Sequence, residues 1–212
     1  MVEGVVAALF VLIALDYGTN GRLGWAVSVA QLSLFAVGIW QGQASLGSWL
    51  DWPFLVLYSA LGIVLGYGLY ALSSLATHVT PKEVVAYFME GKGFFRFYRE
   101  RSGVALSYLF MAYFEEVLWR AIVQGALTEI LSSQTLGVLI AAAFFTMMHF
   151  RYFIELPIRW AEFFVFSLVL GVLYASTGSL FLVTLVHFLR NLHVTFFGHW
   201  DEQQAQTEQT QP

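Results

Sequence analysis

The chain has 212 residues, of which only 11 % are charged (10 Lys plus Arg, 14 Asp plus Glu), and its formal net charge is −4. A soluble domain carries about 25 % charged residues, whereas 58 % of this chain is hydrophobic, so the composition excludes a soluble globular protein and a disordered one. The acidic balance argues against a nucleic-acid partner. The absence of cysteine excludes disulfides, thiolate metal sites and a cysteine nucleophile. The composition therefore indicates an integral membrane protein whose surroundings are the lipid bilayer.

Long apolar runs alternate with short stretches that contain charges, Pro or Gly. Since a helix needs about 20 residues to cross a bilayer, we expect an all-α fold, a polytopic membrane helix bundle with about seven transmembrane helices, six to eight being possible. The first run is short for a full crossing, so whether it spans the membrane is left open. Residues 1–198 are expected to form one integral-membrane domain with spans at 4–17, 24–41, 53–76, 104–126, 135–153, 160–176 and 180–198.

Three glycines mark one face of the third expected span. Gly62, Gly66 and Gly68 form a stripe of small residues on this apolar helix. Small residues let two membrane helices approach closely. We expect this stripe to pack against another helix.

Basic residues gather on one side of the expected spans. The connections at 42–52, 127–134 and 177–179 contain no Lys or Arg, whereas the loops on the other side and their flanks contain Arg22, Lys82, Lys92, Arg96, Arg99, Arg101, Arg151 and Arg159. The positive-inside rule makes that other side cytoplasmic. With seven spans, we therefore expect a multi-pass protein with its N-terminus outside and its C-terminus in the cytoplasm. We expect the membrane to be a prokaryotic inner membrane.

Two stretches outside the expected spans have distinct compositions. Segment 77–103 mixes aromatic residues with alternating charges, which predicts either an amphipathic helix in the cytoplasmic interface or a polar loop with aromatic anchors. The Gln-rich tail, 199–212, has no apolar periodicity and is expected to be disordered.

Three charged residues fall inside the fourth expected span. Glu115, Glu116 and Arg120 lie there, and each charged residue costs about 2.5–3.5 kcal/mol near the centre of a membrane helix. These side chains must therefore face a protein interior or a water-filled cavity. The spacing of four residues predicts an ion pair between Glu116 and Arg120. Glu115 points about 100° away and lacks that partner, which suits a carboxylate that exchanges protons.

Two other spans carry imidazoles. His149 lies four residues after Phe145, and His187 lies four residues before Asn191, so His187 and Asn191 share one helix face. A single membrane histidine is most simply a hydrogen-bonding residue between helices. Polar residues on three helices can instead converge on one cavity, and a carboxylate, two imidazoles and an amide are the groups that hydrolysis by activated water requires.

These residues also carry a resemblance. The pattern E-E-x-x-x-R from Glu115 to Arg120, F-x-x-x-H from Phe145 to His149 and H-x-x-x-N from His187 to Asn191 occurs in this order. Together with the stretch 171–180, the set resembles the CPBP family of intramembrane proteases, which includes CAAX prenyl endopeptidases and bacteriocin-processing or immunity proteins. The resemblance covers residues 104–197.

The resemblance implies a role for each residue. Glu115 would be the general base that activates water, and His149 would orient that water. His187 and Asn191 would form the oxyanion site, while Glu116 and Arg120 would support the arrangement. The family has been described both as metalloproteases and as glutamate-type enzymes, and this sequence has no H-E-x-x-H helix. We favour a mechanism without a cofactor or metal, and the alternative is a catalytic zinc held by Glu115, His149 and His187.

The resemblance thus implies an intramembrane endopeptidase that acts near the membrane surface. Its substrate would be a peptide or lipoprotein: the C-terminus of a lipidated or membrane-anchored protein, or a bacteriocin or other peptide precursor. Two further functions stay open. Buried Glu and His residues also serve proton-coupled transporters and channels, and the family includes non-catalytic immunity proteins.

Overall fold

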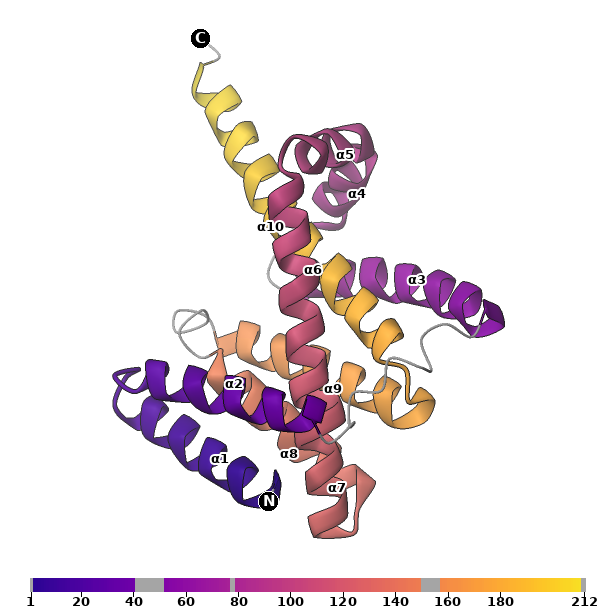
Figure 1. The fold of residues 1–212 in the computed structure, drawn as a ribbon. Coiled ribbons are helices and arrows are strands. Elements are labelled where there is room, and N and C mark those ends of the chain that lie inside the picture. Colours follow the sequence, from indigo (N-terminus) through magenta and orange to yellow (C-terminus); the bar gives the residue numbers. More distant parts are fainter. Residues whose placement is uncertain (1, 41–51, 77–78, 150–156, 211–212) are drawn as a thin grey trace.

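The computed structural model describes residues 2–40, 52–76, 79–149 and 157–210, and every element in these ranges is helical. The N-terminal half contains α1 (Val2–Gly18), α2 (Gly24–Trp40), α3 (Trp52–Ala76), α4 (Pro81–Met89) and α5 (Gly91–Glu100) (Figure 1). The C-terminal half contains α6 (Ser102–Glu116), a π-helical segment (Val117–Gln124), α7 (Gly125–Leu131), α8 (Gln134–Met148), α9 (Pro157–Thr177) and α10 (Leu180–Thr210). The predicted all-α fold is confirmed.

Each of the seven expected spans corresponds to helical structure. Within the described ranges, three stretches are long and apolar enough to cross a membrane, namely Phe54–Leu75, Ile158–Thr177 and Leu180–Gln204. The apolar helices Gly24–Trp40 and Gln134–Met148 are shorter. The protein is therefore an integral membrane protein, while the number of seven crossings stays a prediction. Residues 150–153 of the fifth expected span, with Arg151, lie outside the described residues.

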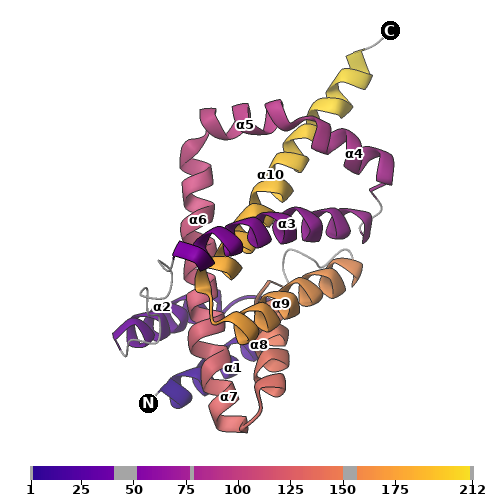
Figure 2. The same ribbon diagram turned by 90° about the vertical axis from the view of Figure 1, so that its right-hand side faces the viewer.

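The fourth expected span is not one regular α-helix. Helix α6, the π-helical segment and α7 follow one another along a single rod, and α3 runs at a steep angle to this rod in both views (Figures 1 and 2). Every residue from Val117 to Gln124 is buried. This segment lies in a core with side chains from α1, α2, α8, α9 and α10. Short π-helical stretches in membrane and soluble helices often mark functional sites, and this one begins directly after Glu116.

Helix α10 packs closely against α3 through two of the three glycines. A Cβ atom on Gly62 would lie 2.8 Å from Leu185 Cδ2, and one on Gly66 would lie 2.8 Å from Leu189 Cβ. Gly68 differs, because no described side chain lies within 4 Å of such an atom. The predicted packing role therefore holds for Gly62 and Gly66, and was wrong for Gly68.

The segment after α3 forms two short helices. Thr80 caps α4 in a capping box with Glu83, and Pro81 begins the helix. The aromatic side chains of the two helices do not all face the outside, because part of them packs against the rest of the protein. Tyr87 and Phe94 pack in a second core with residues of α3 and α10, and the Tyr98 hydroxyl donates to the Leu192 carbonyl at 2.6 Å. The alternative of a polar loop was wrong.

Helix α10 continues to Thr210, beyond residue 198, where we expected the last span to end and a disordered tail to begin. Gln, Glu and Ala have good helix propensity. Adding one residue to an existing helix also avoids the nucleation cost. The polar tail can therefore extend a helix that the membrane and the second core already stabilise.

Candidate active site

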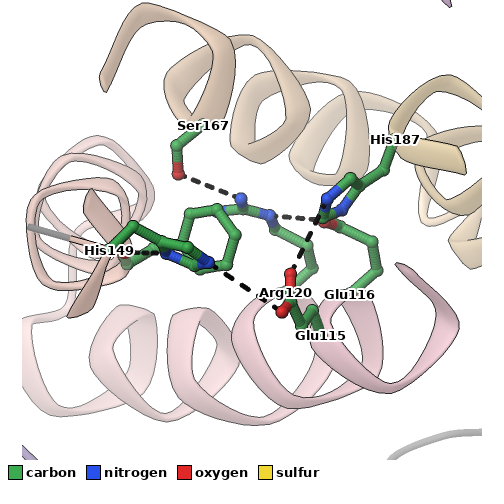
Figure 3. Close-up of polar contacts among 7 residues, drawn as sticks. Glu115, Glu116, Arg120, His149, Ser167 and His187 are labelled. Carbon is green, nitrogen blue, oxygen red and sulfur yellow. Dashed lines mark hydrogen bonds and ion pairs between the residues drawn. The ribbon is translucent and has the colours of Figure 1, made fainter. Parts of the chain in front are cut away.

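The predicted polar residues of three separate spans meet at one place. Glu115, Glu116 and Arg120 come from the end of α6 and the π-helical segment, His149 from the end of α8, and His187 from α10 (Figure 3). The packing of the helices brings these residues to the same depth in the bundle. The expected span boundaries alone did not predict this.

Glu116 is the fully buried carboxylate of the site. Arg120 Nε donates to Glu116 Oε2 at 2.9 Å, and neither side chain is accessible to solvent. This contact confirms the ion pair that the four-residue spacing predicted. A buried charge pair needs further hydrogen bonds to be stable. Arg120 Nη2 donates to Ser167 Oγ at 3.0 Å, and Glu116 Oε1 lies 2.7 Å from His187 Nδ1.

The hydrogen bonds of the two imidazoles determine which nitrogen faces Glu115. His149 Nδ1 lies 2.8 Å from the Phe145 carbonyl oxygen, which can only accept, so this nitrogen carries a proton. His187 Nδ1 likewise donates to Glu116, because the ion pair with Arg120 keeps that carboxylate ionised. The Nε2 atoms of both rings are left to face Glu115.

Glu115 lies between the two Nε2 atoms. Its Oε1 is 3.9 Å from His149 Nε2, and its Oε2 is 3.6 Å from His187 Nε2. Unlike Glu116, its side chain keeps 14 % of its surface exposed. Glu115 is therefore the carboxylate that a small molecule can reach, while Glu116 is sealed behind it.

Asn191 lies one turn after His187 on α10 and is half-buried. Within the described ranges its side chain makes no hydrogen bond, so its predicted part in an oxyanion site depends on the shared helix face alone.

No group of three or more His, Asp or Glu side chains among the described residues has the geometry of a metal site. The zinc alternative would use Glu115, His149 and His187 as ligands. In the structure these three side chains are not arranged as a metal site.

The sequence reasoning missed several polar contacts around the site. Gln124 Nε2 donates to the Gly171 carbonyl at 3.0 Å, one turn along from the contact between Arg120 and Ser167. The spacing of four between Arg120 and Gln124 is a signal that could have suggested this second contact. Ser167 gave no such signal, because single serines are common in apolar helices.

These features define an all-α integral membrane protein with a polar centre enclosed by its helices. Residues 100–193 match the family of Rce1-like type II CAAX prenyl endopeptidases, which are proteases, and this segment contains all seven fixed residues of the three motifs. The resemblance stated above to the family of intramembrane proteases is thereby confirmed for this part of the chain. No curated protein and no solved structure matches the chain significantly.

Proposed function

We propose that the protein is an intramembrane endopeptidase that hydrolyses a peptide bond with water activated by Glu115. The observation that carries this proposal is the position of the accessible Glu115 carboxylate between His149 Nε2 and His187 Nε2. Both distances exceed a direct hydrogen bond. A water molecule can bridge groups at such separations.

When the His149 ring is neutral with its proton on Nδ1, its Nε2 atom is an acceptor that suits the orientation of this water. A water that donates one O–H to Glu115 and the other to His149 keeps a lone pair free to attack a carbonyl carbon. Glu115 accepts the proton as the new C–O bond forms, and it returns the proton to the amide nitrogen as the C–N bond breaks. This sequence of proton transfers needs no cofactor.

His187 suits the stabilisation of the tetrahedral oxyanion. Because its Nδ1 atom donates to Glu116, its Nε2 atom can donate only when both ring nitrogens are protonated. The charges of Glu115 and Glu116 then balance those of Arg120 and the imidazolium, so the centre stays neutral overall. Asn191, one turn further on, would supply the second donor of the oxyanion site.

The positions of the basic helices support the proposed orientation. Helices α4 and α5 and the C-terminal end of α10 lie at one end of the molecule, away from the N-terminus (Figure 2). Lys82, Lys92, Arg96 and Arg99 belong to these helices. By the positive-inside rule this end is cytoplasmic. We propose that the C-terminus lies there, in a prokaryotic inner membrane. The substrate is the C-terminus of a lipidated or membrane-anchored protein, or a bacteriocin or other peptide precursor.

The decisive experiment replaces Glu115 by glutamine in the purified protein in liposomes. The probe is an internally quenched, S-prenylated peptide that ends in a CAAX sequence, as the matched family's description suggests. We expect Glu115→Gln to lower kcat by roughly 10²–10⁴-fold, with an unchanged thermal midpoint. The matched control is Glu129→Gln on the exposed side of α7, which should keep full activity.

Full activity of Glu115→Gln would remove Glu115 as the base. No hydrolysis by the wild type, together with flux driven by a pH gradient across the liposomes, would instead support a proton-coupled transporter. A chelator addresses the zinc alternative separately. Activity that a chelator removes and added zinc restores would overturn the metal-free mechanism.

A further inference from the structure

A second buried ion pair joins α9 to α10 beside the candidate site. Arg190 Nη2 donates to both carboxylate oxygens of Glu162, at 2.9 and 3.0 Å. The two side chains keep only 9 % and 11 % of their surface exposed. Charges in membrane helices are rare and usually serve a function. Neither residue is a fixed position of the three motifs, since Arg190 occupies a variable position of H-x-x-x-N.

The guanidinium of Arg190 lies against two aromatic rings of α9. Its Cζ atom is 4.4 Å from the ring centroid of Phe166 and 5.4 Å from that of Phe163. Both distances fall in the range of cation–π attraction, which is strongest where the cation is desolvated. The ion pair with Glu162, the residue before Phe163, holds the guanidinium in this position.

The same two rings contact the two candidate catalytic histidines. The centroid of Phe163 is 4.8 Å from that of His149, and the centroid of Phe166 is 5.4 Å from that of His187. One layer of aromatic rings therefore separates Arg190 from both imidazoles. His149 depends on this layer in particular, because it lies at the very end of α8 and its ring is held by contacts with Phe145 and Phe163.

We infer that Glu162 and Arg190 are positioning residues of the protease, which act through Phe163 and Phe166 to aim the Nε2 atoms of His149 and His187 at Glu115. The inference rests on the proposed function. In this role the pair acts through the two rings and not by contact with substrate. It ties α9 to α10 so that the two rings cannot move away from the imidazoles, and a misplacement of about 1 Å can lower an enzyme's rate by roughly 100-fold.

The first test compares kcat and KM for the quenched prenylated peptide. We expect Glu162→Gln and Arg190→Gln to lower kcat by roughly 10- to 100-fold with KM within about twofold, since only groups aimed at the transition state are displaced. Arg190→Lys keeps the charge but loses the planar stack on the rings, so it should recover part of the loss. The matched controls, Arg159→Gln and Arg159→Lys, change an exposed arginine of the same region and should leave kcat unchanged.

The second test is a double-mutant cycle of Glu162→Gln and Phe163→Leu. If Glu162 acts through Phe163, the combined loss in kcat will be no larger than the greater single loss. Losses that multiply would overturn the inference, as would full activity of Glu162→Gln. The inference would also be overturned if every variant lost activity in proportion to a fall in its thermal midpoint and Arg190→Lys recovered none of it. The pair would then have a purely structural role.

The wild type and Glu115→Gln separate this inference from the proposed function. If the wild type cleaves the peptide and Glu115→Gln does not, the proposed function holds, and normal kinetics of the Glu162 and Arg190 variants would refute the positioning role alone. If the wild type cleaves nothing, the proposed function itself fails.

Discussion

His187 donates a hydrogen bond from Nδ1 to Glu116 Oε1 at 2.7 Å, and this contact directs its other ring nitrogen toward Glu115. The two adjacent glutamates therefore have different surroundings. Glu116 is sealed from solvent and holds Arg120 and His187, while Glu115 keeps an exposed edge. Two adjacent residues of the same type thus provide one sealed and one accessible carboxylate, because the helix points them in different directions.

The first prediction follows from this division. Glu116→Gln should lower the free energy of unfolding by about 3–5 kcal/mol, because it leaves the buried Arg120 charge uncompensated. Glu115→Gln should change it far less, since Glu115 has no arginine partner and is partly exposed. Unfolding of each variant in mixed micelles measures both changes in the free energy of unfolding. Equal stability of the two variants would contradict the assignment, and Glu116→Gln combined with Arg120→Met should recover part of the loss.

The proposed oxyanion site predicts a kinetic signature. His187→Ala and Asn191→Ala should each lower kcat by roughly 10²–10³-fold and raise KM much less, because the lost donors act mainly in the transition state. Steady-state kinetics with the quenched prenylated peptide measure this split. His199→Ala, on the same helix beyond the site, serves as the control and should be unaffected. A normal kcat for Asn191→Ala would remove Asn191 from the site.

The contact between α3 and α10 predicts opposite effects of two similar substitutions. Gly66→Ala should destabilise the protein by about 1–3 kcal/mol, as overpacking does, because its Cβ atom would lie 2.8 Å from Leu189 Cβ. Gly68→Ala meets no described side chain within 4 Å, and alanine favours a helix by about 1 kcal/mol over glycine. Thermal unfolding of the two variants measures both changes in stability. An equal change in the two variants would contradict the described packing.

The capping box of α4 predicts a local pH dependence. Hydrogen bonds from the backbone N–H and the side chain of Thr80 hold the pKa of Glu83 below its ordinary value of 4.5. A lowered folded-state pKa means that the cap stabilises α4 above pH 4.5 and is lost as the pH falls through the folded pKa. Hydrogen-exchange protection in the first turn of α4 should therefore decrease on acidification.

Two variants test whether Glu83 causes this pH dependence. Glu83→Gln keeps an acceptor at the same position without a titrating group, so protection should no longer vary with pH. Glu83→Ala should lower protection at every pH. A pH dependence that persists in Glu83→Gln would show that another group is responsible.

Helix content and the identity of the core motif residues could be predicted from the sequence, because both depend on local patterns. Apolar runs of sufficient length must form helices in a bilayer, where each backbone N–H and C=O needs a partner within the segment. The spacing of four that pairs Glu116 with Arg120 follows from the period of one helix. All seven expected apolar segments are helical, and residues 115, 116, 120, 149 and 187 meet at one site.

Other features depend on contacts between distant segments, and only the tertiary structure decided them. The tilt of each helix determines whether Glu115, His149 and His187 lie at one level, and hydropathy carries no information on tilt. Likewise, the burial of Tyr87 and Phe94 against α10 and the pairing of Glu162 with Arg190 join residues that are far apart in the chain. The sequence determined which groups could not face lipid. The packing of α9 and α10 against the π-helical segment decided which side chains became the hydrogen-bonding and ion-pair partners of these groups.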